Sequence, residues 1–458
     1  MPPVVIGLDI DKTVALHPAF FAEFSKAMAA AGHTIVVVTA RRSEESSAQD
    51  LRAMGIAFHR VVCATAEVIE RHGPAWRREV CRELGVDVLF DESPTVLRPV
   101  DARAAGPLVA TPEGRGRAAG ASGGARPVAV GATEIESFEA DAADLMRTTP
   151  PRWDSAHKRA IAERSCPPAA IHRGRVRYSR WSLAAMPNAD LLECPPVECS
   201  LVHGPMQYIA NDESEMHWHL NFADPELFFA YGSPLLAQDE WQVLEHPVLG
   251  SLRERLVADG RAPRTREGSG ATPVLIEGVE RRCELRVVPG PGDRFPPLYG
   301  NGFARASIAH VLSALRPLER TSLSNIIAIA VPVGGRGEYT GAEVATILRT
   351  ATTAFAAAVI RSRSAGLSPR TVIHTGLWGC GAFGGNPVLM TAVQLVAARV
   401  AGADELRFAV PDPSRLPDVR HGVRVFEGLL TPAQPVRLPN LVKALSDMGF
   451  RWGVGDGN

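Results

Sequence analysis

A glycine-rich loop is the first part of this sequence whose residue types could do chemistry. It runs from His374 to Asn386, is written HTGLWGCGAFGGN, and has five glycines in ten residues. Glycine lets backbone N–H groups turn toward a ligand without steric cost. Several inward N–H groups, together with the positive end of a following helix, make a cradle for an anion such as phosphate or diphosphate. The alternative is a tight strand-to-helix turn that binds nothing.

A pair of carboxylates is the second such part. Asp9 and Asp11 stand at i and i+2 just after VVIGL, an apolar run that predicts a buried strand. Two further predicted strands end in polar residues, TIVVVT at Thr39 and VDVLF before Asp91 and Glu92. Open α/β sheets bind ligands at the carboxyl ends of their strands. We therefore expect these groups to converge on one site.

The elements beside the glycine loop are well marked. Arg370 to His374 is an apolar strand, and a helix follows the loop at once. Asn386 suits the helix N-cap and Pro387 the first helical position. The helix carries one apolar stripe, formed by Leu389, Val393, Val396 and Val400. This pattern predicts a strand, a ligand loop and a core helix in sequence.

The length and composition limit the kinds of protein that this sequence can form. A chain of 458 residues has room for two or three domains, and its 49 basic and 50 acidic residues balance to a net charge of −1. Such balance argues against a general binder of polyanions. Seven scattered cysteines are typical of reduced thiols, so we expect a cytoplasmic protein. No run of eighteen apolar residues occurs, so no membrane segment is expected.

Three smaller features leave alternatives open. RGRVRYSRW places arginines among aromatic residues and could line a nucleic-acid groove, although a half-exposed edge strand is the other reading. His217 and His219 are two residues apart, and we expect a strand with exposed histidines rather than metal ligands. Ile135, Phe138 and Leu145 have helical spacing and predict a helix.

The string TGLWGCGAFGG closely resembles the diphosphate-binding loop of the poly(ADP-ribose) glycohydrolases, a branch of the macrodomain fold. The order of predicted strands and helices is similar to that family over about residues 200–412. The resemblance implies a domain that binds ADP-ribose or an ADP-ribosylated macromolecule and needs no cofactor. The diphosphate would be held by Gly379, Cys380, Gly381, Ala382, Phe383 and Gly384.

A second stretch resembles the catalytic region of the same family. Asn221-Phe222-Ala223-Asp224 matches its Asp-Phe-Ala-Asn segment, and Gln238-Asp239-Glu240 matches its Gln-Glu-Glu. The resemblance implies that Glu240 is the acid/base and that Asp239 positions the distal ribose hydroxyls. Asp224 and Gln238 would contact the ligand.

The chemistry explains the two adjacent carboxylates. Cleaving an ADP-ribosyl bond passes through an oxocarbenium-like state, so a carboxylic acid must protonate the leaving oxygen and then activate water. Burial and a second acid raise the pKa of such a group. The sequence differs from the family pattern at two places in this region. Phe229-Ala230-Tyr231 stand near the position of the family's three glycines, and Leu377 stands where the family usually has Asn. A glycohydrolase with a changed leaving group and a reader that binds ADP-ribose without cleaving it both remain open.

Residues 3 to 100 resemble the haloacid dehalogenase-like phosphatases. The resemblance implies that Asp9 is the nucleophile, that Asp11 is the acid/base and that Thr39 holds the phosphoryl group. Asp9, Asp11 and Asp91 would surround a Mg²⁺ ion, a cation that prefers hard oxygen ligands. The family's lysine is replaced, because the equivalent place offers only Arg77 or Arg78.

Spacing also predicts a phosphatase-like domain without a cap, since the residues between Thr13 and Thr39 are taken up by one helix. The expected architecture is therefore α/β in two units: a capless Rossmannoid domain over 1–101, a linker over 102–132, an accessory helical segment over 133–200 and a macrodomain over 201–458. The expected function is an ADP-ribosyl glycohydrolase fused to a Mg²⁺-dependent phosphatase. The alternative is a reader, with all chemistry in a nucleotide or nucleic-acid end phosphatase.

Overall fold

The computed structural model describes residues 3–457 except for 11–13, 17, 40, 42, 66–79, 82, 91–130, 168, 269, 289–295, 333, 365–368 and 432–434. The chain forms two compact units, Met1–Gly123 and Gly124–Asn458. Asp11, Asp91, Glu92, Arg77 and Arg78 lie outside the described residues, as does nearly all of the predicted linker.

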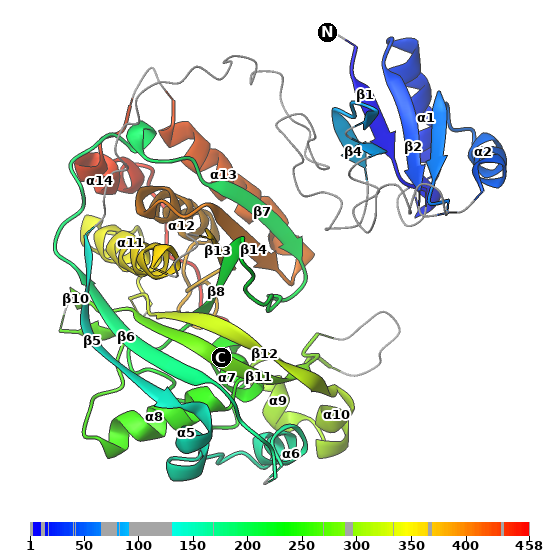
Figure 1. Cartoon of the computed structure of the whole chain (residues 1–458). Helices are drawn as coiled ribbons and strands as arrows, with labels where there is room; N and C mark the ends of the chain where they lie inside the picture. Colours follow the sequence, from blue (N-terminus) through cyan, green and yellow to red (C-terminus); the bar gives the residue numbers. More distant parts are fainter. Residues whose placement is uncertain are drawn as a thin grey trace. The chain divides into compact units, whose positions relative to one another are not determined.

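The first unit is built on a parallel sheet of four strands in the order β3-β2-β1-β4 (Figure 1). Its strands and helices are β1 (Val5–Leu8), η1 (Val14–Leu16), α1 (Pro18–Ala30), β2 (Thr34–Thr39), α2 (Glu44–Ala53), β3 (Arg60–Cys63) and β4 (Val88–Phe90). Alternate residues of β2 enter two different cores, Ile35 and Val37 on one face and Val36 and Val38 on the other. Burial on both faces explains why the strands read as continuous apolar runs.

The second unit holds a sheet of eight strands in the order β5-β6-β11-β12-β8-β13-β14-β7. The five from β12 to β7 are parallel, whereas β11, β6 and β5 run antiparallel to their neighbours. The strands are β5 (Ala132–Asp141), β6 (Arg175–Leu183), β7 (Glu198–His203), β8 (Glu215–Phe222), β11 (Val274–Leu285), β12 (Leu315–Ile329), β13 (Arg370–Thr375) and β14 (Glu405–Val410). A short hairpin of β9 (Arg266–Glu267) and β10 (Gly270–Ala271) stands apart from this sheet.

Helices cover the two faces of this sheet (Figure 1). One group is α11 (Gly341–Arg363), α12 (Pro387–Ala401), α13 (Leu416–Leu429) and α14 (Leu441–Ser446). The other is α5 (Ala142–Thr148), α6 (Ala156–Ser165), α7 (Gln238–Glu245), α8 (Val248–Ala258), α9 (Gly302–Arg305) and α10 (Ile308–Ser313). Short 3-10 turns are η3 (Leu191–Glu193), η4 (Pro413–Arg415) and η5 (Leu438–Asn440). On β12, Ile327 packs in the core of the first group and Ile326 in that of the second.

The helix start predicted after the glycine loop is confirmed. Asn386 caps α12, its side chain accepting from the N–H groups of Val388 and Leu389 at 3.0 and 3.1 Å. Thr340 and Glu343 form a reciprocal capping box at the start of α11. Among the described helices α11 alone has the length and apolarity of a membrane span, and 72% of that apolar stretch is buried in the unit, as in a core helix.

The helix predicted from Ile135 and Phe138 is wrong. Both residues lie on β5, where burial alternates along the strand and Ile135 is exposed. Glutamates of β5 pair with arginines of the neighbouring strand β6, so the strand is the more stable arrangement. Of the three residues, Leu145 alone falls in a helix, α5. Residues 133–200 thus place β5 and β6 in the main sheet instead of forming an accessory helical segment.

The arginines of β6 pair with glutamates of the neighbouring strand β5. Arg175, Arg177 and Arg180 form ion pairs with Glu139, Glu134 and Glu136 of β5. The strand lies between β5 and β11, so the edge-strand interpretation is wrong.

The prediction of exposed histidines on β8 is also wrong. His217 and His219 are buried, because β8 is a central strand with both faces covered. The ring of His219 stacks on His374 of β13 at 4.5 Å, and His217 Nδ1 lies 3.1 Å from His374 Nε2. Burial lowers the pKa of His219 to about 3, so its ring is neutral. No group of three metal-ligating side chains occurs in the part of the chain that the structure describes.

Candidate active site

The acid pair Asp239 and Glu240 lies in the first turn of α7. Gln238 fixes this turn to the end of β8: its Oε1 accepts from the N–H of Phe222 at 2.8 Å, and its Nε2 donates to the carbonyl of Leu220 at 3.0 Å. Both polar groups of the Gln238 side chain therefore form hydrogen bonds with the backbone of β8. The pair is placed at the carboxyl end of a central parallel strand, where α/β sheets bind ligands.

Both carboxyls are buried, with 6% of Asp239 and 4% of Glu240 exposed. Asn221 donates to Asp239 Oδ1 at 2.9 Å, and the N–H of Ala237 donates to Glu240 Oε2 at 2.9 Å. Burial raises the pKa of Asp239 to about 8, and the charge of Glu240 adds to the rise. Burial also raises the pKa of Glu240. Because two neighbouring buried carboxylates repel, the pair retains a proton near neutral pH.

A buried lysine accompanies the pair. Lys158 of α6 is fully buried and its ammonium donates to the carbonyl of Tyr231 at 2.7 Å. Burial lowers the pKa of Lys158 to about 8, while the charges of Glu240 and Asp239 oppose that shift. The sequence gives no sign that Lys158 is buried, because α6 has the composition of a polar helix and lies about 80 residues before the acid pair.

The loop in place of the family's three glycines is held by packing. Phe228 has φ of 55°, the only positive value at a non-glycine residue in the described segments. Tyr231 accepts from the N–H of Arg152 at 2.6 Å and donates to Glu254 at 2.9 Å. A Cβ on Gly232 would come within 2.3 Å of the carbonyl of Arg152. These contacts hold the Tyr231 carbonyl against Lys158.

The glycine loop has the form of a cradle. The N–H of Gly385 donates to the carbonyl of Gly379 at 2.8 Å, and that of Gly384 to Gly381 at 3.0 Å. Gly379 has φ of +75°, and a Cβ there would meet Val331 at 2.7 Å. The N–H groups of the three residues Gly381 to Phe383 donate to no backbone carbonyl among the described residues. Since the Asn386 side chain caps α12, these loop amides are the groups left to bind an anion.

The end of the chain covers this cradle. The N–H of Gly453 donates to the carbonyl of Gly384 at 2.8 Å, and that of Asp456 to Gly381 at 3.4 Å. Trp452 stacks on Tyr339 at 4.1 Å and anchors the segment. A Cβ on Gly381 would lie 3.1 Å from a carboxylate oxygen of Asp456. Residues 453–457, here called the tail, therefore place an anionic side chain beside the predicted anion site.

Tyr299 is a tyrosine on which charges of both the tail and the acid pair act. Desolvation of its hydroxyl and the charges of Asp456 and Glu240 raise its pKa to about 12. Asn301 donates to the carbonyl of Gly457 at 2.9 Å. The tail is thus attached both to Asn301 and to the cradle, where Asp456 lies beside Gly381.

Asp224 lies near the acid pair, since its charge helps to raise the pKa values of both Asp239 and Glu240. Its Oδ1 accepts from the N–H of Glu226 at 2.9 Å, which fixes the side chain at the start of the loop. In the first unit, Asp9 and Thr39 are buried at the carboxyl ends of the adjacent strands β1 and β2.

Comparison with protein families gives one match. Residues 318–415 match the model described as poly(ADP-ribose) glycohydrolase (PARG), macro domain fold. This range runs from β12 through α11, β13, the glycine loop, α12 and β14 to η4. This part of the second unit is therefore similar to the macro domain fold of PARG.

Solved structures of PARG from Deinococcus radiodurans are similar to this chain. One complex with ADP-ribose is 12% identical, covers 64% of this chain and 95% of its own, and has a TM-score of 0.32. A second complex with ADP-ribose is 14% identical, with the same coverage and a TM-score of 0.31. The apo form is 14% identical over 65% of this chain and 94% of its own, with a TM-score of 0.28. No curated protein matches the chain.

Proposed function

We propose that the second unit is an ADP-ribosyl glycohydrolase that removes ADP-ribose from a modified macromolecule. The observation that carries the proposal is the buried acid pair Asp239 and Glu240 at the start of α7, whose charges act on the buried ammonium of Lys158. A PARG-type macrodomain match over 318–415 supports the ligand class.

Glu240 is assigned the acid/base role. Its carboxylic acid donates a proton to the leaving oxygen as the anomeric bond breaks, and the resulting carboxylate then takes a proton from the attacking water. Asp239, held by Asn221, binds ribose hydroxyls through its second oxygen. The ammonium of Lys158 allows one of the two carboxyls to ionise while the other keeps its proton.

The leaving-group side of the site differs from the family pattern. Phe229 is 62% exposed where the family has glycine, while its neighbours Phe228 and Tyr231 are buried. A bulky side chain at this place reshapes the surface on which the group beyond the distal ribose would rest. We infer that this loop selects the acceptor from which ADP-ribose is released.

Release of ADP-ribose tests the proposal. The full chain is incubated with mono-ADP-ribosylated protein and with poly(ADP-ribose), and free ADP-ribose is measured by chromatography. Wild-type protein releases it, Glu240→Gln does not, and Glu319→Gln, at an exposed glutamate of β12, behaves as wild type. Tight ADP-ribose binding without turnover of either substrate would select the reader function instead.

For the first unit we propose a Mg²⁺-dependent phosphomonoesterase. Asp9 offers a buried carboxylate next to Thr39 at the carboxyl edge of a parallel sheet, a fitting place for a nucleophile and a hard oxygen ligand. Asp11 and Asp91 would complete the metal site, and the ion would neutralise phosphoryl charge. Mg²⁺-dependent phosphate release from nucleotides that is lost in Asp9→Asn and retained in Glu23→Gln supports this activity. Release that survives in Asp9→Asn refutes it.

A further inference from the structure

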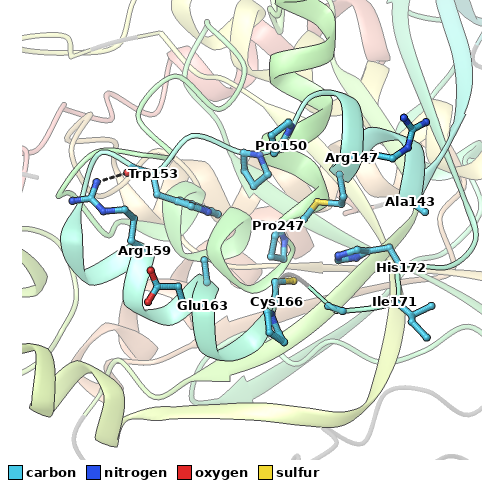
Figure 2. A pocket seen from close by; sticks show the side chains of 15 residues that line it. Ala143, Arg147, Pro150, Trp153, Arg159, Glu163, Cys166, Ile171, His172 and Pro247 are labelled. Carbon is cyan, nitrogen blue, oxygen red and sulfur yellow. Dashed lines mark hydrogen bonds between the residues drawn. The ribbon is translucent and has the colours of Figure 1, made fainter.

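A pocket separate from the acid pair lies between α5, α6 and the segment after α6 (Figure 2). Its volume is about 660 Å³, and neither Asp239 nor Glu240 lines it. Most of its lining is apolar, with Met146, Pro150, Pro151, Trp153, Ile171 and Pro247. A largely apolar pocket of this volume, with a few polar groups in its walls, has the form of a small-molecule site.

The walls of this pocket are held in place by contacts within the second unit. Arg159 Nη1 donates to the carbonyl of Trp153 at 2.7 Å, the dashed line in Figure 2, and to that of Asp154 at 3.0 Å. The Trp153 indole packs edge-on against Tyr231, with ring centroids 5.3 Å apart. Because these walls are already fixed, a ligand that enters the pocket has little protein structure to order.

One wall of the pocket carries a buried cluster of charges. His172 points its imidazole ring into the pocket in Figure 2, and its Nδ1 lies 2.8 Å from Glu280 Oε2 on β11. A carboxylate this close favours a protonated imidazole. Interactions with the side chains of Cys166 and Glu280 raise the pKa of His172 to about 9, which supports a protonated ring at neutral pH. Arg282 Nη1 donates to the other carboxylate oxygen of Glu280 at 3.1 Å, so the three side chains, here called the His172 cluster, hold two cations around one anion.

The other charges around the pocket compensate one another. Arg147 forms an ion pair with Asp144 at 2.6 Å. Arg159 and Glu163 lie one turn apart on α6 and contribute one charge of each sign. The His172 cluster therefore leaves one positive charge in excess beside an apolar cavity. A buried charge is costly unless it is paired, so an anionic group on a ligand would be stabilised at this wall.

We propose that this pocket is a binding site for an organic monocarboxylate with an apolar body. The carboxylate lies beside the His172 cluster, and the apolar body packs against Met146, Trp153 and Pro247. A cationic ligand of the same shape is repelled by the cluster, and a neutral one leaves the excess charge uncompensated. Because the acid pair does not line the pocket, binding here does not depend on the proposed hydrolysis.

Calorimetry with matched ligands tests the site on the unmodified protein. The full chain is titrated at neutral pH with decanoate, decylamine and octanoate, each below its micelle concentration. We expect decanoate to bind at one site and decylamine, which is a cation of the same chain length, to bind about tenfold or more weakly. Octanoate should bind about tenfold more weakly than decanoate because it buries two fewer methylene groups. Absence of decanoate binding overturns the proposal, and decylamine that binds as tightly as decanoate overturns the carboxylate as the ligand class.

Three variants locate the binding within the molecule. Ala162→Phe fills the pocket and should weaken decanoate binding by about tenfold or more, whereas Ala156→Phe is the control, because Ala156 is exposed on the same helix and does not line the pocket. His172→Gln removes the excess charge and should weaken decanoate by about tenfold without weakening decylamine. Thermal unfolding of each variant is measured in parallel. A folded Ala162→Phe that binds decanoate like Ala156→Phe refutes the pocket as the site, and a folded His172→Gln that keeps the wild-type preference for decanoate refutes the role of the charge.

Discussion

Removing the tail after Trp452 should strengthen ADP-ribose binding. The tail lies across the loop that we expect to bind the diphosphate, and Asp456 places a carboxylate beside Gly381. A ligand anion must displace this segment before it reaches the loop amides. Truncation leaves Trp452 in place on Tyr339, so the fold around the loop is preserved.

The size of the effect follows from the contacts that the tail makes with the loop. Two backbone hydrogen bonds join them, Gly453 to Gly384 and Asp456 to Gly381. Each contributes about 1 kcal/mol net, so the ligand displaces about 2 kcal/mol of interaction. Since 1.4 kcal/mol is a factor of ten, Kd for ADP-ribose should fall about 30-fold on truncation.

Isothermal titration calorimetry of the full chain and of a chain ending at Trp452 measures this difference. Val454→Ala is the control, because Val454 is 94% exposed and its side chain makes no core contact. An unchanged or weaker affinity after truncation would refute the reasoning and would show that ADP-ribose does not compete with the tail.

Three further predictions concern the acid pair and the cradle. The charge of Lys158 lowers the pKa values of Asp239 and Glu240, and Lys158→Met removes it. In a plot of hydrolysis rate against pH, the alkaline limb of this variant should therefore move to higher pH. An alkaline limb that stays in place would contradict this prediction. Folding raises the pKa of Asp239 from 3.8 to about 8, so the fold favours the protonated side chain. The contribution of Asp239 to the free energy of unfolding is therefore complete at low pH and is lost as the pH rises between these two values. Asp239→Asn should therefore raise Tm relative to wild type by more than about 2 °C at pH 8 and by less at pH 5, as measured by calorimetry. Gly379 and Gly449 both have a positive φ, but a Cβ would meet a neighbour, Val331, only at Gly379. Gly379→Ala should therefore lower the free energy of unfolding by about 1–3 kcal/mol more than Gly449→Ala, as measured by denaturant unfolding.

The strand, loop and helix around the cradle could be predicted from local signals. Asn386 and Pro387 mark a helix start by their own chemistry, and the glycines mark the turn before it. These residues act on neighbours within a few positions, so the sequence alone contains the information. The acid pair was found through its resemblance to a family, because two adjacent carboxylates at a helix start are common on ordinary surfaces.

Lys158 and the tail could not be predicted in this way. Lys158 is buried because α6 packs against a loop about 70 residues later in the chain, and only the fold brings its ammonium to the Tyr231 carbonyl. The tail reaches Gly381 and Gly384 through backbone contacts that carry no side-chain signature. For β5, the spacing of Ile135 and Phe138 fits a helix, but pairing of residues 132–141 with β6 makes the segment a strand.

The most direct test of the central claim compares cleavage and binding in Glu240→Gln. The substitution keeps the shape of the side chain and an acceptor for the N–H of Ala237, so the start of α7 should be retained. We predict that kcat for release of ADP-ribose falls by about a thousandfold, the range of general acid catalysis, while Kd for ADP-ribose stays within a factor of about three. Wild-type turnover by a folded Glu240→Gln would contradict the assignment.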